Sequence, residues 1–194
     1  MPVKQELYGG AIVTVIPDGF LDASMLREVP DTQEVFVNSR KEQDRFEDGL
    51  GTNESVIVDL LQRVSEQDNR KALDVHIREV SSINGTNEWH LLKLDGEGTS
   101  TQTCVAAESA LKWGKEDMRE TLVLCLALIR LEDVETDVII TVNVPMDDAS
   151  ELEELDQWVS DDTRKPLPPR VRASYAVLKQ MVQEFRIIDK SLFV

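Results

Sequence analysis

The chain contains few of the residues that build disulfide-rich or metal-binding proteins. Among its 194 residues are only two cysteines and two histidines. Two cysteines do not make a disulfide framework, and because Cys104 and Cys125 both lie in apolar runs, we expect buried free thiols. Neither His76 nor His90 has a cysteine or a second histidine at ligand spacing, so we expect no metal site and no other cofactor.

Long apolar runs are also lacking. No stretch approaches the roughly 18 uncharged apolar residues that are needed to cross a bilayer. No apolar segment typical of a secretory signal follows Met1. These two features predict a soluble intracellular chain without a membrane partner.

Positive charge is scarce. The chain has 21 Lys and Arg residues against 37 Asp and Glu residues, which gives a net charge of −16. This excess of acid argues against binding to DNA, RNA or an anionic membrane through nonspecific charge. A protein with a basic surface is the natural complement. Long-range attraction of this kind speeds encounter more than it secures affinity.

The first half of the chain mixes strand and helix patterns. β-Branched residues predict a strand over 9–16, and the Asp22-Ala23-Ser24 segment predicts a short connection with about one helical turn. A second helix is predicted over 69–80, where Asn84-Gly85 ends it. The first predicted helix precedes it and is capped by Thr52 or Asn53. Its amphipathic pattern comes from the spacing of Val56, Ile57, Leu60, Leu61 and Val64.

The second half is richer in strands, which are predicted over 89–94, 101–111, 121–130 and 137–144, with a break at Trp113-Gly114-Lys115. The segment 121–130 is apolar on both alternating sides, so both faces of its sheet must be covered and it should be a central strand. Together with 137–144 it is predicted to form an antiparallel hairpin. Pro168-Pro169 begins the last helix. Its buried stripe comprises Val171, Tyr175, Leu178, Met181, Val182 and Phe185.

The segment 147–162 is unusual because it contains eight acids and no base. Leu152, Leu155, Trp158 and Val159 are spaced for one face of a short helix. Like-charge repulsion and the absence of caps nevertheless predict a marginal helix or a mobile, solvated loop.

The order of these elements predicts an α+β fold, in which a single mainly antiparallel β-sheet is flanked by helices on both faces. The length fits one domain over 1–194. The acidic segment, at about 146–166, is expected to be a mobile insertion in that domain.

A proline-containing turn followed by a strand carries exposed charge. Pro30 pushes its predecessor into extended geometry, so residues 29–32 predict a turn that leads into the strand. Along that strand, residues 35 and 37 point to one side and residues 34, 36 and 38 to the other. Asp31 and Glu34 are therefore expected three residues apart, near an exposed Phe36.

Several short motifs of the chain resemble those of a known family. They are Leu7-Tyr8-Gly9-Gly10-Ala11-Ile12, Pro17-Asp18-Gly19-Phe20, Asp22-Ala23-Ser24, Val29-Pro30-Asp31-Thr32-Gln33-Glu34-Val35-Phe36 and Thr52-Asn53-Glu54-Ser55. Together they closely resemble the Mog family of Ran-binding nuclear import factors, and the similarity to yeast members extends from about Leu7 to Phe193. The resemblance implies the fold shared with the extrinsic photosystem protein PsbP, although a shared fold transfers no activity.

The same resemblance implies a function. Members bind the small GTPase Ran, favour its GTP-bound form and promote guanine nucleotide release in support of nuclear import. The family's acidic surface cluster maps onto Asp31 and Glu34, and we expect Phe36, Asp22 and Arg27 as neighbours at the Ran-binding site. The resemblance further implies a non-hydrolytic regulator, which we expect to be a monomer found in the nucleus and cytoplasm.

The residues alone leave other interpretations open. Asp31 and Glu34 could be solvated turn residues without a function. They could also serve a carboxylate-based hydrolase or metal enzyme, although no Ser/His or Cys/His pair supports them and exposed turn acids should titrate normally. A third alternative is a non-catalytic scaffold that recruits another basic partner through the acids of 147–162.

Overall fold

The computed structural model describes residues 2–41, 43–44, 46–111, 119–161 and 166–193. An antiparallel sheet of seven strands forms its centre. In spatial order the strands are β3 (Phe20–Asp22), β4 (Gln33–Asn38), β5 (Ser55–Gln62), β9 (Thr136–Met146), β8 (Arg119–Leu131), β7 (Thr101–Leu111) and β6 (Trp89–Asp95). The predicted break at Trp113-Gly114-Lys115 lies outside the described residues.

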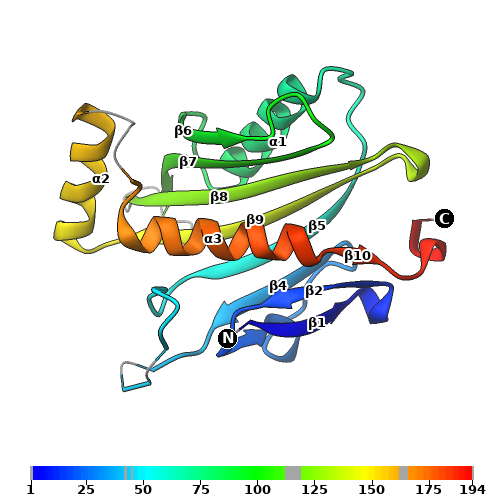
Figure 1. Cartoon of the computed structure of the whole chain (residues 1–194), viewed down its shortest axis with the longest axis horizontal. Coiled ribbons are helices and arrows are strands. Elements are labelled where there is room, and N and C mark those ends of the chain that lie inside the picture. Colours follow the sequence, from blue (N-terminus) through cyan, green and yellow to red (C-terminus); the bar gives the residue numbers. More distant parts are fainter. Residues whose placement is uncertain (1, 42, 45, 112–118, 162–165, 194) are drawn as a thin grey trace.

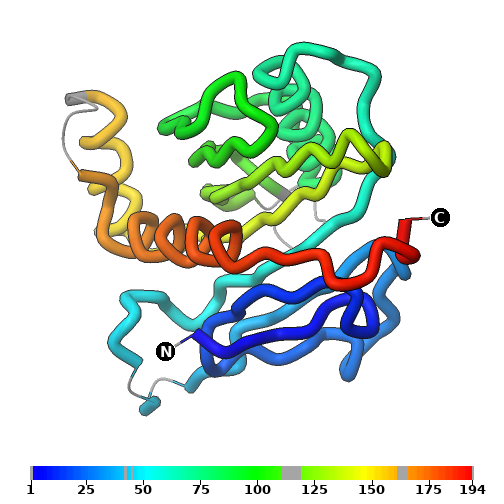
Figure 2. Tube along the Cα trace, turned by 45° about the vertical axis from the view of Figure 1, so that its right-hand side comes forward, coloured from blue at the N-terminus to red at the C-terminus, as the bar shows by residue number. Residues whose placement is uncertain are grey.

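Three further strands, β1 (Val3–Leu7), β2 (Ile12–Ile16) and β10 (Arg186–Ile187), form a separate sheet in which β2 is central. The predicted strand over 9–16 thus begins only at Ile12, because the 3-10 turn η1 (Tyr8–Gly10) precedes it. β10 pairs with β2, and Figure 2 shows the carboxy-terminal segment running beside the amino-terminal strands. This pairing docks the carboxy-terminal segment against the amino-terminal sheet.

Helices cover both faces of the large sheet, as predicted (Figure 1). On one face, α1 (Asn69–Ile83) packs Leu73 and Ile77 against Leu126 and Leu128 of β8. On the other face, α3 (Pro169–Glu184) contributes Val171, Tyr175, Leu178 and Met181 to the main core. Because β8 is apolar on both sides, it can be buried from both directions. The α+β class and the interior position of β8 are confirmed, whereas the described strands form two sheets and not the single sheet that was predicted.

The predicted helix around 56–64 is wrong, since these residues form strand β5. Its register pairs Val56 with Val142 of β9 and with Phe36 of β4. Val56 and Val58 are fully buried on one face, whereas Leu61 packs on the opposite face with α1. The run Val56-Ile57-Val58 is β-branched, which favours a pleated strand between two neighbours over a helix.

Of the two alternatives for 147–162, a marginal helix or a mobile loop, the helix is observed over Ala149–Asp161 as α2, whereas the predicted absence of caps is wrong. The Asp148 carboxylate accepts hydrogen bonds from the backbone N–H groups of Ser150 (2.8 Å) and Glu151 (3.3 Å) and so caps the first turn. Leu155 and Trp158 are buried with 4% and 6% exposure. Packing and capping therefore offset the repulsion among the acids.

The docking of α2 can be tested with a Trp158→Ala variant. Removal of a buried aromatic side chain should lower the free energy of opening this helix by about 3–5 kcal/mol. Amide hydrogen exchange over 149–161 should accelerate by roughly a hundredfold or more, if α2 opens as a local unit. The control is Val159→Ala, since Val159 lies on the same helix but is 54% exposed. Equal exchange in both variants would contradict the docked helix.

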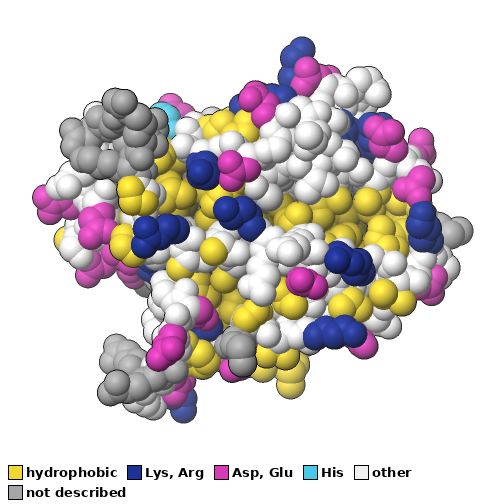
Figure 3. Space-filling view, viewed as in Figure 1, with side chains coloured by type: hydrophobic (Ala, Val, Ile, Leu, Met, Phe, Trp, Pro, Cys, Tyr) yellow, Lys and Arg dark blue, Asp and Glu magenta, His cyan; other side chains and the backbone are white. Residues whose placement is uncertain are grey.

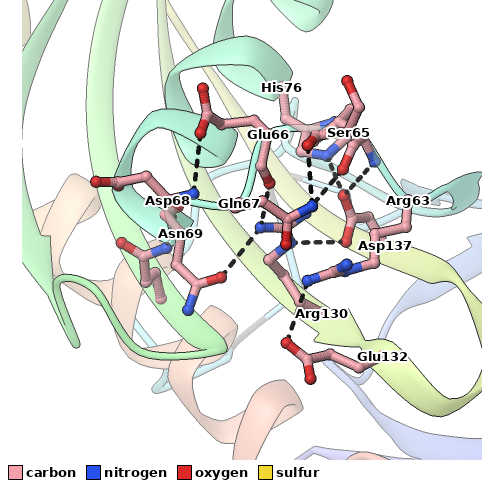
Figure 4. A network of polar contacts seen from close by, with 12 residues as sticks. Arg63, Ser65, Glu66, Gln67, Asp68, Asn69, His76, Arg130, Glu132 and Asp137 are labelled. Atoms are coloured by element: carbon pink, nitrogen blue, oxygen red, sulfur yellow. Dashed lines mark hydrogen bonds and ion pairs between the residues drawn. The ribbon is translucent and has the colours of Figure 1, made fainter.

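A buried polar network joins α1 to the β8–β9 hairpin (Figure 4). Asp137 Oδ1 accepts from Arg130 Nε at 3.1 Å, and Asp137 Oδ2 lies 2.9 Å from His76 Nε2. Arg130 also donates to the carbonyl oxygens of Val64 and Glu66. Burial opposes ionisation of Asp137, but the hydrogen bonds from His76, the Val64 N–H and Arg130, with the charge of Arg130, outweigh it and lower the pKa of Asp137. The network fixes the connection between β5 and α1.

Candidate functional site

Four of the predicted site residues come together around strands β3 and β4. Asp22 ends β3, and Arg27 follows the 3-10 turn η2 (Ala23–Met25). Asp31 lies in the turn before β4, and Glu34 is the second residue of that strand. β3 pairs with β4 in a register that places Asp22 opposite Phe36. Strand pairing therefore brings Asp22 onto the same face of the sheet as Glu34.

Glu34 is anchored to the amino-terminal sheet. Its Oε1 accepts a hydrogen bond from the Tyr8 backbone N–H at 2.5 Å. Tyr8 holds a left-handed φ of 52°, and its hydroxyl donates to the Val58 carbonyl at 2.8 Å. Such a backbone conformation is uncommon for a residue other than glycine and persists where surrounding contacts fix it. Glu34 thus has a structural contact besides any contact with a partner.

The ionisation of Glu34 is perturbed. Partial burial raises its pKa above the usual value, the Tyr8 N–H acts in the opposite direction, and the negative charge of Asp22 raises it further. The expectation that both acids titrate as ordinary turn carboxylates is therefore wrong for Glu34. The physical reason is that Tyr8 of η1 and Asp22 of β3 lie beside the start of β4, which a local sequence window does not reveal.

Asp31 occupies a more open position. It is exposed and, together with Arg27, lines a shallow depression whose other lining residues are Ser24, Glu28, Val29 and Pro30. The Gln33 N–H donates to the Pro30 carbonyl at 2.8 Å and closes the turn. The turn predicted at 29–32 is confirmed, and it presents Asp31 to solvent at a defined place beside Arg27.

Asp22 acts as a cap within this surface. Its Oδ1 accepts from the Ser24 N–H at 2.8 Å and so holds the start of η2. A carboxylate in this position satisfies a backbone donor that the short turn leaves free. Asp22 therefore fixes the backbone between β3 and Arg27 and is only partly exposed.

Phe36 is not the exposed aromatic that the alternation suggested. It is 2% exposed and belongs to the main core with Leu7, Ile12 and Val56. Val35, its neighbour on the opposite face, is also buried at 4% exposure. Both sides of β4 are covered at this point, so Phe36 supports the surface from beneath and is not available to touch a partner.

Two exposed apolar side chains in the same region were not predicted from the sequence. Met25 and Leu26 are 73% and 67% exposed and lie between Asp22 and Arg27 in the chain. The signal was an apolar pair flanked by polar residues in a short connection. Tyr8 was missed as well, because its contact with Glu34 joins residues 26 positions apart.

Surface charge differs between regions of the molecule. Acidic side chains gather over α2, at the left of the view in Figure 3, whereas basic side chains lie along α3. The bases of α3 include Arg170, Arg172 and Lys179. Arg170 is paired with Glu54 at 2.6 Å and with Glu151 at 2.9 Å. The net negative charge is therefore uneven, and the β3–β4 surface differs from the α3 surface in what it can attract.

The chemistry available to Asp31 and Glu34 is mainly that of hydrogen-bond acceptors and negative charge. Across the parts of the chain that the structure describes, no group of three or more His, Cys, Asp or Glu is placed to hold a metal ion. Among the described helices, none is long and apolar enough to pass through a membrane. The arrangement suits binding to Lys or Arg side chains of another protein.

Comparisons with known proteins identify the family of the chain. Residues 5–145 match the family described as Ran-interacting Mog1 protein. The chain is 49% identical over 189 residues to the nuclear import protein MOG1 of Saccharomyces cerevisiae, covering 97% of this chain and 83% of that protein. It is 28% identical over 155 residues to the Ran guanine nucleotide release factor of Danio rerio, with coverage of 74% and 79%.

A solved structure shows the same fold. The crystal structure of the S. cerevisiae Ran-binding protein Mog1p superposes with a TM-score of 0.86 at 47% identity, over 100% of this chain and 99% of that one. Near-complete coverage at this identity extends the match from the motifs to the whole fold. The chain therefore belongs to the Mog1 family of Ran-interacting proteins.

Proposed function

We propose that this chain binds Ran, preferentially in its GTP-bound form, and promotes release of the guanine nucleotide in support of nuclear import. The observation that carries the proposal is the 49% identity, over 97% of this chain, to a nuclear import protein. Relatives named Ran guanine nucleotide release factor support the second part. The protein then acts as a non-hydrolytic regulator, in the nucleus and cytoplasm, and works as a monomer.

The surface proposed to contact Ran comprises Asp31, Glu34, Asp22 and Arg27. Asp31 lies exposed at the rim of the depression that Arg27 also lines. Asp22 and Glu34 lie on the same face beside β4, where burial first and then the negative charge of Asp22 raise the pKa of Glu34. A cationic side chain of the partner would relieve this repulsion and strengthen its own attraction to the surface.

Nucleotide release requires more than binding. A regulator shifts the nucleotide equilibrium of a GTPase only if it binds the nucleotide-free or distorted form more tightly than the loaded form. We propose that the carboxylates of Asp31 and Glu34 compete with phosphate for GTPase lysines or disturb the Mg²⁺ site. This route uses charge and geometry without bond breaking in either protein.

The test is release of a fluorescent GTP analogue from Ran at increasing concentrations of the protein. We expect acceleration by the wild type and loss of most of it in an Asp31→Asn, Glu34→Gln double variant. Gln keeps an oxygen that can accept the Tyr8 N–H, so the variant removes charge while keeping the Glu34 contact. Loss of a favourable charge cluster should slow association by roughly tenfold or more.

The matched control is Asp147→Asn, Glu154→Gln, which changes net charge equally at exposed positions near or on α2. It should release nucleotide as the wild type does. Lost release with retained binding in the site variant would support competition for the nucleotide site, whereas loss of both would show a docking role. If the control variant loses activity equally, the acids of the α2 region recruit the partner and the proposed site is wrong.

A further inference from the structure

Two neighbouring apolar side chains project from the candidate site. Met25 is 73% exposed and Leu26 is 67% exposed. A single exposed apolar side chain is common on protein surfaces and needs no explanation. Two adjacent ones beside a charged depression are less ordinary, because folded proteins gain by covering such surface.

The backbone that carries this pair is fixed. The Asp22 carboxylate caps the turn through the Ser24 N–H, and the N–H groups of Leu26 and Arg27 both donate to the Ala23 carbonyl, at 2.9 and 3.0 Å. Ala23 itself is buried at 1% exposure. Met25 and Leu26 are therefore presented on an ordered turn, so binding a partner would cost little backbone entropy.

The pair adjoins the charged surface. Ser24 precedes it and Arg27 follows it, and both residues line the depression that extends to Asp31. An apolar centre with a charged, solvent-accessible rim is the usual organisation of a protein interface. Few residues at such a centre supply most of the affinity, whereas rim charges mainly alter the association rate.

We propose that Met25 and Leu26 form the apolar anchor by which this surface holds Ran, and that the anchor fits an apolar hollow on Ran bordered by Lys or Arg. The inference rests on the proposed function. Ran is the proposed partner because Met25 and Leu26 adjoin the Asp31 surface, where Ran is proposed to bind. The negative charge of that surface is complemented by basic residues around the hollow on Ran. The long, flexible side chain of Met25 is suited to filling such a hollow.

Substitutions in the apolar anchor and in the charged rim should affect different rates, dissociation and association respectively. In surface-based binding of Ran to the full-length chain, a Met25→Ser, Leu26→Ser variant should raise Kd by about 30-fold, chiefly through faster dissociation. Its association rate should keep the salt dependence of the wild type. The Asp31→Asn, Glu34→Gln variant should instead slow association and weaken that salt dependence.

Two controls accompany this experiment. Val159→Ser removes an exposed apolar side chain from α2 and should leave Kd within about twofold. Substitutions at surface positions outside an interface change the binding free energy little. Met25→Leu, Leu26→Met exchanges the two side chains and should retain most of the affinity. This second control separates loss of apolar contact from disturbance of the turn.

The outcomes are distinguishable. If the wild type binds Ran and releases nucleotide, and the Met25→Ser, Leu26→Ser variant dissociates from Ran at the wild-type rate, the anchor is overturned and the proposed function stands. Equal loss in the exchanged variant would also overturn it, since the shape of the turn and not apolar contact would then matter. Absence of Ran binding by the folded wild type would overturn both.

Discussion

The Phe36→Ala variant should lose about 3–5 kcal/mol of the free energy of unfolding. Phe36 is 2% exposed and lies in the main core where β4 faces the small sheet, with Leu7 and Ile12 in the same cluster. Truncation would remove apolar contacts and leave a cavity that a rigid pair of sheets cannot fully close. Such a loss is a large fraction of the stability of an ordinary domain.

Denaturation by urea, followed by fluorescence and circular dichroism, measures this effect. Met25→Ala serves as the control because Met25 is 73% exposed, and it should alter stability by no more than about 0.5 kcal/mol. Binding provides the opposite comparison, since Met25→Ala should weaken Ran binding while it leaves folding intact. A Phe36→Ala protein of normal stability that fails to bind Ran would instead restore Phe36 to the contact surface.

An Asp137→Asn variant should lose a comparable amount, about 3–5 kcal/mol at neutral pH, since it leaves a buried cation without its partner. Arg130 and Asp137 are 4% and 0% exposed and face each other across the β8–β9 pair. Asn keeps the size of the side chain and an oxygen for the Val64 N–H. The variant therefore tests mainly the charge at the centre of the network.

The pH dependence gives this prediction a second observable. The pKa of Asp137 is lowered from its ordinary value of 3.8, so folding favours the ionised form. The stabilisation is fully present above the unfolded value and is lost as the pH falls through the lower folded value. The difference between wild type and variant should thus be largest at neutral pH and shrink below about pH 4.

Asp133→Asn is the matched control for this variant. Asp133 pairs with Lys190 at the surface, where solvent screens the interaction, so its replacement should change stability little. A wild-type minus variant difference for Asp137 that is constant from neutral to acid pH would contradict an ionised Asp137 at the centre of the network.

Local patterns were sufficient where neighbours in the sequence also determine the environment. The run 121–130, which is apolar on both alternating sides, predicted a strand covered on both faces, and Pro168-Pro169 marked the start of α3. The turn at 29–32 followed from the restrictions that Pro30 places on the backbone. The two acids Asp31 and Glu34 were also located correctly, in the turn and in the strand.

Local patterns failed where distant segments supplied the environment. The apolar spacing from Val56 to Val64 fitted one face of a helix, but pairing with β4 and β9 satisfies the backbone of β5 on both edges. The acids of α2 predicted a marginal helix or a mobile loop, and the burial of Leu155 and Trp158 that stabilises the helix was not visible locally. In both cases tertiary packing outweighed the intrinsic preference.

The sequence by itself determined the family, the α+β class, the excess of negative charge and the position of Asp31 and Glu34 along the chain. Only the tertiary structure decided which of these side chains can be reached. Pairing of β3 with β4 gathered Asp22 and Glu34, the small sheet buried Phe36, and the cap by Asp22 left Met25 and Leu26 exposed on an ordered turn. Exposure depends on what packs over a residue, and here the covering segments come from distant parts of the chain.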